Sequence, residues 1–206
     1  MMKLHWSPRS PYVRKVMIAA HELGLQDRLE CLRTVVGGTK PHRDLMTRNP
    51  LGKIPTLELE DGTVIYDSFV VIAYLDTLHA RPKLIPADGV AWLTALRRHA
   101  LGNGMLDVAL AALGERFRPA DRQSEAHLTL WHLKLRTCVD ALEQEAEALA
   151  GDRFDLGHLA IGVALAYLDF RFESEKWREG HPKLAAWHAT FNDRPSVVAN
   201  PPVDDR

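Results

Sequence analysis

The stretch NPLGKIPTLELEDGTVIYDSFVVIAYLD, residues 49–76, decides the fold, and its first feature is a pair of prolines. Pro50 and Pro55 each lack an N–H group and have a fixed φ, so neither fits the interior of a helix or a central strand. The local sequence leaves two interpretations of Pro55 open. Either it belongs to a plain turn, or the Ile54–Pro55 bond is cis, because a cis bond before proline costs only ~0.5–1 kcal/mol over trans.

The rest of this stretch predicts a β-hairpin followed by a helix. Residues 56–59 alternate in polarity, Asp61-Gly62 suits a hairpin turn, and residues 63–65 form the returning strand. Asp67-Ser68 then provides a capping pair for a helix over residues 69–78.

The residues before this stretch predict a strand–helix–strand unit. Residues 3–6 and 29–35 are expected to be strands, and Ser10 and Pro11 suit the N-cap and first position of the helix between them. With the hairpin and helix that follow, the order βαβ–ββα predicts a small α/β layer domain over residues 1–78.

Beyond residue 78 the pattern changes. The proline-containing segment HARPKLIPAD predicts a linker over residues 79–87. Residues 88–206 show apolar side chains at steps of three and four and almost no strand pattern, so we expect an all-α helical bundle domain. Its helices are expected over residues 88–115, with a bend at Gly102 and Gly104, and over residues 124–150, 155–172 and 182–192.

The composition excludes several classes of function. The 206 residues include 26 basic and 27 acidic side chains without a basic stripe, so no nucleic-acid partner is expected. No run reaches the ~18 apolar residues of a membrane span and the N-terminal segment is not a secretory signal, so we expect a cytoplasmic protein with no membrane partner. The ten histidines form no metal-binding motif, and no metal is expected. Cys31 and Cys138 lie outside any CxxC motif and are expected to be buried, unpaired thiols.

Three segments resemble the cytosolic glutathione S-transferase family. SPRSPYVRKV (7–16) is similar to the first strand-to-helix turn of the serine-type members, residues 49–76 to the glutathione-binding stretch, and HPKLAAWHATFNDRPSV (181–197) to the C-terminal helix and tail. The resemblance extends over nearly the whole chain. It implies a thioredoxin-like N-terminal domain, an all-helical C-terminal domain and glutathione as co-substrate.

The resemblance assigns roles to four residues of the deciding stretch. Pro55 would be the cis-proline, and Ile54 would pair through its backbone N–H and C=O with the cysteinyl part of glutathione, as an added strand does. Asp67 and Ser68 would hold the γ-glutamyl amino and carboxylate groups, at a helix N-terminus that favours a carboxylate. Capping by this pair is expected with or without a ligand.

Two cations are candidates for the glycine end of glutathione. Lys53 directly precedes Ile54 and resembles a binding lysine of some transferase classes. His42 lies on the polar loop GGTKPHRD, where an ordinary loop histidine is the alternative. A cation near an exposed carboxylate contributes only ~1 kcal/mol.

The resemblance also implies how the glutathione thiol is activated. A serine hydroxyl would donate a hydrogen bond to the thiolate, which is the nucleophile. Ser10, just before Pro11, is favoured for this role over Ser7, which lies nearer the end of the first strand. A serine cannot form a mixed disulfide with glutathione, so addition of glutathione to a small electrophile is expected in place of thiol–disulfide exchange. Arg14, one helical turn after Ser10, is expected to form a surface or interdomain salt bridge; the alternative is that it orients nearby groups.

Other interpretations remain open at this stage. A glutathione transferase fold can serve as a non-catalytic binding or regulatory protein, or the site can support a glutathione-dependent isomerase or dehalogenase. The family resemblance implies a homodimer. Met105, Leu106 and Ala109 either line the pocket of the electrophile or belong to the core. Asp155 is expected to cap the third helix of the bundle, although His158 replaces the usual acidic partner of a capping box.

Overall fold

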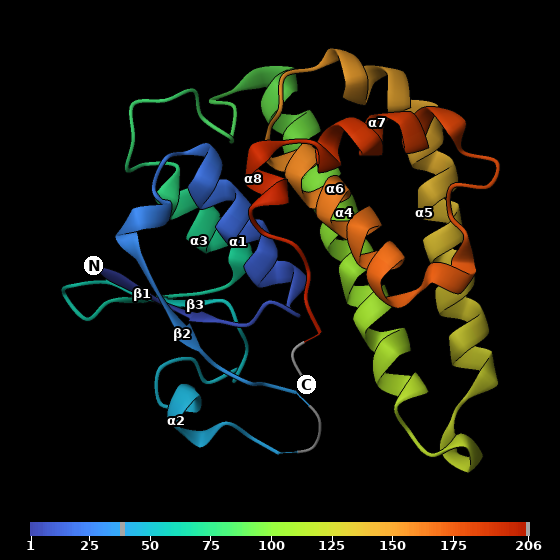
Figure 1. Cartoon of the computed structure of the whole chain (residues 1–206), viewed down its shortest axis with the longest axis horizontal. Coiled ribbons are helices and arrows are strands. Elements are labelled where there is room, and N and C mark those ends of the chain that lie inside the picture. Colours follow the sequence, from blue (N-terminus) through green and yellow to red (C-terminus); the bar gives the residue numbers. More distant parts are fainter. Residues whose placement is uncertain (38–39, 205–206) are drawn as a thin grey trace. The chain divides into compact units, whose positions relative to one another are not determined.

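Four strands form a mixed sheet in the computed structural model, which describes residues 1–37 and 40–204. The strands are β1 (Met2–Trp6), β2 (Leu29–Arg33), β3 (Thr56–Glu58) and β4 (Val64–Ile65). β1 pairs in parallel with β2 and antiparallel with β3, and β4 pairs antiparallel with β3. The resulting order β2-β1-β3-β4 places β1 inside the sheet and β2 at one edge (Figure 1).

Two helices, α1 (Pro11–Glu22) and α3 (Ser68–Leu75), pack against each other beside this sheet. Both begin as predicted, because the side chains of Ser10 and Asp67 accept hydrogen bonds from the first turn of the helix that follows. The predicted βαβ–ββα thioredoxin-like order is therefore confirmed. Its core consists of fully buried apolar side chains from both layers: Leu4, Val13, Val16, Leu57, Val71, Ile72 and Leu75.

Two expectations, one for the polar loop and one for the two cysteines, were wrong. The polar loop contains a short helix, α2 (Arg43–Met46), which begins because His42 caps it; residues 38 and 39 of the loop lie outside the described residues. Cys31 is exposed and Cys138 is only half-buried. Cys31 lies on the edge strand β2, which has a neighbouring strand on one side only.

The chain divides into two compact units, Met1–Ile85 together with Pro195–Arg206, and Pro86–Arg194. The division expected from the sequence, into 1–78, 79–87 and 88–206, differs from these units because it left the tail with the helical domain. The short helix α8 (Pro195–Val198) in this tail packs on α1, which accounts for the grouping.

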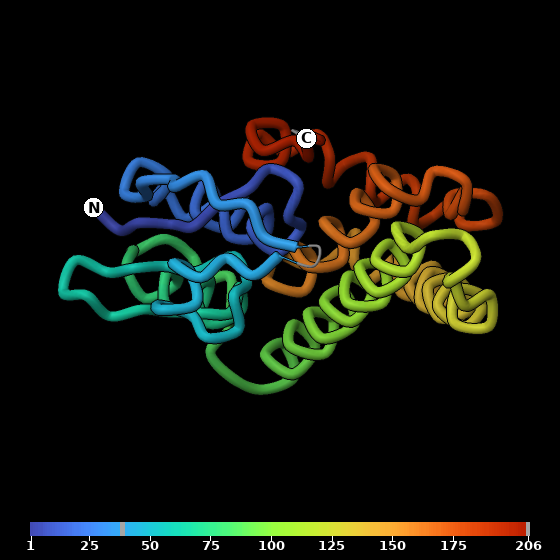
Figure 2. Tube along the Cα trace, turned by 90° about the horizontal axis from the view of Figure 1, so that it is seen from below, coloured from blue at the N-terminus to red at the C-terminus, as the bar shows by residue number. Residues whose placement is uncertain are grey.

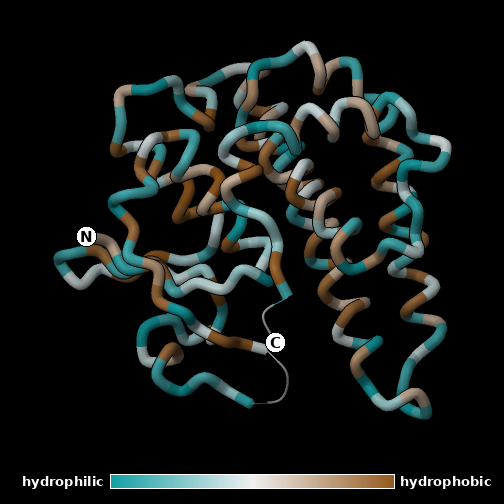
Figure 3. Tube along the Cα trace, viewed as in Figure 1, coloured by the Kyte–Doolittle hydropathy of each residue, from teal (hydrophilic) through white to brown (hydrophobic). Residues whose placement is uncertain are grey.

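The second unit is all-helical, as predicted. Its α-helices are α4 (Gly89–Arg116), α5 (Glu125–Gly151), α6 (Leu156–Arg171) and α7 (Pro182–Asn192), and short 3-10 turns are η2 (Ala120–Arg122) and η3 (Glu173–Glu175), with η1 (Gln26–Arg28) in the first unit. Residues 156–168 of α6 are all buried, so α6 is the central helix of the bundle. In α5 hydrophobic and hydrophilic residues alternate along the helix, as expected for a helix with one buried face (Figure 3).

The expected bend at Gly102 and Gly104 is absent, because α4 continues through both residues. A Cβ atom at Gly102 would lie only 2.6 Å from the carbonyl carbon of Ala160 in α6. Gly102 therefore allows close packing of α4 against α6, which lie together in both views (Figures 1 and 2).

Among the residues described, none of the helices combines the length and the apolar character that a membrane span requires. The same residues contain no group of three or more His, Cys, Asp or Glu side chains that could hold a metal ion.

Candidate functional site

Three loops meet at one end of the sheet. β1 and β3 are antiparallel with His5 opposite Thr56, so the residues after β1 and those before β3 leave the sheet at the same end. β4 is antiparallel to β3, and the residues that follow it leave by this end as well. Ser7, Ile54 and Asp67 are therefore brought to the same end of the sheet, although up to 60 residues separate them in the sequence.

The first loop is a tight turn between the two candidate serines. The N–H of Ser10 donates to the carbonyl of Ser7 over 3.1 Å. The hydroxyl oxygen of Ser10 accepts from the N–H of Val13 over 3.3 Å, which uses one lone pair and leaves the hydroxyl proton free to be donated elsewhere. Ser7 is buried, and its hydroxyl has no hydrogen bond within the described part of the chain.

The second loop contains a cis bond between Ile54 and Pro55, as the second interpretation of Pro55 predicts. The side chain of Ile54 is buried with Val13 and Leu45 in one apolar cluster. Its backbone N–H and C=O take no part in the strand ladder or in any other hydrogen bond between described residues. The residue is thus anchored by its side chain, while both its backbone groups remain able to pair with an extended ligand.

A buried asparagine, which the sequence analysis did not identify, holds this second loop in place. The Nδ2 of Asn49 donates to the carbonyl of Lys53 over 3.0 Å and to the hydroxyl of Thr56 over 2.9 Å. Its Oδ1 accepts from the N–H of Leu51 over 3.0 Å, and the Thr56 hydroxyl donates to the Lys53 carbonyl over 2.8 Å. Asn49 and Thr56 are at most 1% exposed, so these bonds are protected from water and stabilise the loop on both sides of Ile54.

The third loop leads into α3. The Oδ1 of Asp67 accepts from the N–H of Phe69 over 3.0 Å, while the residue itself is exposed. Ser68 is only 1% exposed, and its hydroxyl oxygen is buried without any hydrogen-bond partner in the described chain. Buried polar groups are almost always paired, so this hydroxyl at a helix N-terminus points to a partner that the described residues do not supply.

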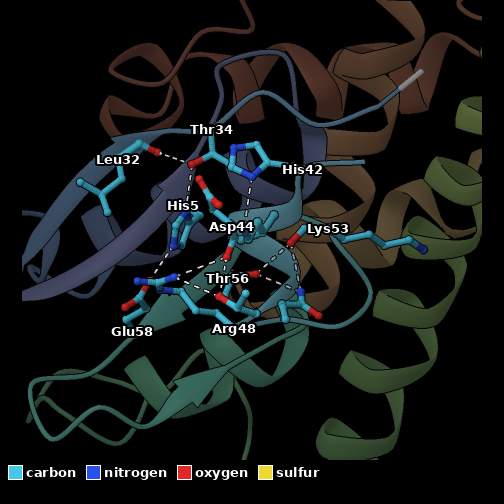
Figure 4. A network of polar contacts seen from close by, with 12 residues as sticks. His5, Leu32, Thr34, His42, Asp44, Arg48, Lys53, Thr56 and Glu58 are labelled. Carbon is cyan, nitrogen blue, oxygen red and sulfur yellow. Dashed lines mark hydrogen bonds and ion pairs between the residues drawn. The ribbon is translucent and has the colours of Figure 1, made fainter. Parts of the chain in front are cut away.

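The two candidate cations differ in what they do within the chain. The Nδ1 of His42 accepts from the N–H of Leu45 over 3.1 Å and so caps α2. The side chain of Lys53 is exposed, makes no ion pair with any described residue, and extends away from the network of polar contacts beside it (Figure 4).

That network connects α2 and its following turn to the sheet. His5 lies at the centre of the sheet with its Nε2 2.7 Å from Oε1 of Glu58 and its Nδ1 2.9 Å from the hydroxyl of Thr34 (Figure 4). Arg48, just before the buried Asn49, forms an ion pair of 2.7 Å with the same Glu58 oxygen. These contacts hold the second loop against β1 and β3. No sequence motif predicts them.

Met105, Leu106 and Ala109 are each at most 1% exposed, which favours the core interpretation over a pocket wall. Arg14 is buried as well and forms no salt bridge with a described residue, contrary to expectation; its Nε donates to the carbonyl of Asn200. The predicted salt bridge is absent because the backbone of the tail around Asn200, and not a carboxylate, lies over this part of α1.

Comparisons with known proteins agree with the fold. Residues 9–78 match the family model for the N-terminal domain of glutathione S-transferases, and residues 125–190 match that for the C-terminal domain. The curated protein "Uncharacterized GST-like protein YibF" from Escherichia coli K12 is 30% identical over 98% of both chains.

Two crystal structures of a glutathione transferase family member from Pseudomonas fluorescens Pf-5 are also similar. The structure with bound glutathione is 38% identical with a TM-score of 0.96, and covers 99% of this chain and 100% of its own. The structure with bound S-(propanoic acid)-glutathione is 39% identical with a TM-score of 0.89, and covers 98% of this chain and 100% of its own.

Proposed function

Because the chain belongs to the glutathione S-transferase family, we propose that it binds glutathione and adds the glutathione thiolate to a small electrophilic substrate. The observation that carries this proposal is the buried hydroxyl of Ser68, which has no partner among the described residues. It lies at the N-terminus of α3, at the end of the sheet where Ile54 and the Ser7–Ser10 turn are also found.

Ser68 and Asp67 would bind the γ-glutamyl end of glutathione. A carboxylate at the start of α3 would accept hydrogen bonds from the Ser68 hydroxyl and from backbone N–H groups of the first turn, with the helix dipole favouring its negative charge. Asp67 is exposed and uses Oδ1 to cap the helix, so Oδ2 remains for the ligand's amino group. Capping and binding are therefore compatible in one carboxylate.

Ile54 would bind the middle of glutathione through its backbone. Its free N–H and C=O offer a donor and an acceptor on one residue, as the edge of a sheet does for an added strand. Asn49 and the buried Ile54 side chain hold this backbone in place before any ligand arrives, which reduces the entropy lost on binding.

Lys53 and His42 would face the glycine carboxylate. The side chain of Lys53 is exposed, and its ammonium group has no ion-pair partner in residues 1–37 and 40–204. Because Nδ1 of His42 accepts a backbone hydrogen bond, the ring proton of the neutral form is at Nε2, which can donate to a carboxylate. Both contributions are expected to be small, at ~1 kcal/mol or less each.

Ser10 would activate the thiol. Lowering the pKa of a thiol from ~8.5 by two units requires ~2.7 kcal/mol of preferential stabilisation of the thiolate. A hydroxyl donor beside the N-terminus of α1 can contribute to this, and the Ser10 hydroxyl still has its proton available. Ser7 is the alternative donor, since its hydroxyl is not engaged by a described residue. That the relative from P. fluorescens binds a glutathione substituted on sulfur supports addition at sulfur as the reaction.

The family relationship also leads us to propose a homodimer. Large hydrophobic side chains are exposed along the first turns of α4, among them Val90 at 81% and Leu93 at 61%. Such side chains on neighbouring turns of one helix suit an interface between copies of this chain.

The experiment that tests the function is a titration with glutathione at millimolar concentrations, with the thiolate followed by its ultraviolet absorbance against pH. The wild type is expected to bind glutathione and to lower its thiol pKa. Ser10→Ala is expected to lose most of this shift with little change in affinity, and Ser7→Ala to keep it. A wild type that binds no glutathione would refute the proposal that the protein is a glutathione transferase. Binding without a lowered pKa of the glutathione thiol would favour the non-catalytic alternative. Loss of the shift in Ser7→Ala alone would reassign the catalytic role to Ser7.

A further inference from the structure

The turn that contains the two candidate serines has a central peptide group that a distant part of the chain contacts. The bond from the Ser10 N–H to the Ser7 carbonyl closes a four-residue turn with Pro8 and Arg9 at its central positions. The peptide group between these two residues takes opposite orientations in type I and type II turns, and proline at the second position suits both. A type II turn also needs a positive φ at the third position, whereas Arg9 is not among the residues with a positive φ, so the turn has the type I orientation. The turn itself favours this orientation, and a contact from outside the turn can hold it more firmly.

The C-terminal tail supplies a contact to this peptide group. The N–H of Val203 donates to the carbonyl of Pro8 over 3.3 Å. Since the Pro8 carbonyl belongs to the central peptide group of the turn, a fixed donor at this position favours the orientation in which the carbonyl faces the tail.

Two further contacts hold the tail along α1. The Nε of Arg14 donates to the carbonyl of Asn200 over 2.7 Å, and the hydroxyl of Ser196 donates to a carboxylate oxygen of Glu22 near the other end of the helix. The side chain of Asn200 donates back to the Ser196 carbonyl over 2.8 Å. The tail thus follows α1 from its C-terminal end to the turn that precedes it (Figure 1).

Arg14 is an unusual anchor because it is buried without a counter-ion. The residue is 8% exposed, burial lowers the pKa of its guanidinium to about 10, and no carboxylate among the described residues lies within ion-pair distance. A buried cation without a carboxylate partner is costly, and the Asn200 carbonyl is the acceptor that compensates it. Arg14 lies four residues after Ser10, on the same side of α1 as the capping serine.

We propose that the tail segment 200–203, anchored by Arg14, positions the Ser7–Ser10 turn so that its serine hydroxyl is oriented toward the glutathione sulfur. Arg14 and the Val203 N–H are positioning groups and do not themselves touch the reacting atoms. The catalytic consequence rests on the proposed function, whereas the effect on the turn does not.

The test removes one N–H group and leaves the rest of the tail intact. Val203→Pro deletes the donor to Pro8, and Val203→Ala is the matched control, because it keeps the N–H and shortens only a side chain that is 45% exposed. Val203→Pro is expected to reduce kcat with a standard electrophile about fivefold, the effect of one neutral hydrogen bond, and to raise the thiol pKa of bound glutathione. The KM for glutathione is expected to stay unchanged, because Ile54, Asp67 and Ser68 are not altered. Val203→Ala is expected to behave as the wild type.

A second pair of variants tests the anchor. Arg14→Gln is expected to reproduce the loss of kcat, and Arg14→Lys, which keeps the charge and a donor, is expected to restore part of it. Because Arg14→Gln could also weaken the fold, its free energy of unfolding is measured alongside, and an unchanged kcat in Arg14→Gln would exclude Arg14 as the anchor.

A readout that needs no glutathione separates this inference from the proposed function. The amide proton of Ser10, bonded to the Ser7 carbonyl, is expected to exchange with solvent faster in Val203→Pro than in Val203→Ala. Equal exchange rates in the two variants would overturn the positioning role, whatever the protein binds. Faster exchange in a protein that binds no glutathione would support the role of the tail and refute only the proposed function.

Discussion

Each compact unit contains a helix that begins after an aspartate, and the two helix starts look alike in the sequence. Asp67 precedes α3 in the first unit, and Asp155 precedes α6 in the second. The Oδ1 of Asp67 accepts one backbone N–H, from Phe69. The Oδ1 of Asp155 accepts two backbone N–H groups, over 2.8 Å from Gly157 and 3.0 Å from His158.

The two helix starts differ in the buried polar side chain beside each cap. His158, 2% exposed, uses both ring nitrogens: Nδ1 lies 2.7 Å from Oδ1 of Asp155 and Nε2 lies 3.1 Å from the carbonyl of Leu149. The hydroxyl of Ser68 is equally buried and has no partner among the described residues. A fully paired cap stabilises the fold, whereas a cap with a buried unpaired donor is prepared for a ligand.

The largest effect is expected at the paired cap. Asp155→Ala removes the acceptor of two backbone N–H groups and leaves the buried His158 without its carboxylate, which should lower the free energy of unfolding by about 3 kcal/mol. Urea denaturation measures this, and Asp155→Asn, which still caps the helix, is expected to lose only part of it. A change below about 0.5 kcal/mol in Asp155→Ala would show that the cap is not structural.

The same carboxylate should make stability depend on acid pH. Burial is the largest influence on Asp155 and by itself raises its pKa, but hydrogen bonds from His158 and Gly157 and the charge of His158 outweigh it and hold the pKa below its usual 3.8. A carboxyl with a lowered pKa in the folded state contributes stability above its unfolded pKa and loses it as the pH falls through the folded value. The difference in unfolding free energy between wild type and Asp155→Asn should therefore be constant near neutral pH and shrink below about pH 4. A difference that does not change with pH would contradict the ionic pairing.

The start of α3, where the Ser68 hydroxyl is unpaired among the described residues, should respond in the opposite way. Ser68→Ala removes a buried hydroxyl that has no partner, so the free energy of unfolding is expected to stay the same or to rise by up to ~1 kcal/mol. Affinity for glutathione should fall by about 10-fold or more, because a hydrogen bond to a charged group contributes ~1.5–3 kcal/mol. Calorimetric titration and urea denaturation of the same variant give both quantities. A destabilised variant with normal glutathione affinity would mean that Ser68 has an internal role.

The contrast between the caps also shows what the sequence could predict. Local rules located the helix starts at Ser10, Asp67 and Asp155, because capping involves neighbouring residues only. The cis bond before Pro55 follows from the family resemblance, since local geometry also allows a plain turn there. The roles of the ligand-binding residues came from the family resemblance, and they remain predictions.

Contacts between distant residues could not be predicted in this way. Asn49 holds the Ile54 loop through groups that come together only when the chain folds. The sequence predicts a bend at Gly102, whereas the structure uses this glycine for close packing against Ala160. Ala160 is 58 residues away in the sequence, so no local pattern indicates that approach. The α2 segment is short and mostly polar, so it lacks the periodic spacing of apolar residues that predicts a helix.

The smallest expected effect distinguishes the two uses of Asp67. Asn caps a helix about as well as Asp, so Asp67→Asn should change the free energy of unfolding by less than about 0.5 kcal/mol, whereas Asp67→Ala should lose ~1 kcal/mol. Asp67→Asn also removes the charge that would attract the amino group of glutathione. Because this site is exposed, that loss corresponds to at most ~1 kcal/mol, or about a two- to fivefold weaker affinity. If Asp67→Asn binds glutathione as tightly as the wild type, Asp67 only caps α3, as Asp155 caps α6, and ligand recognition at this helix depends on Ser68 and the backbone of the first turn.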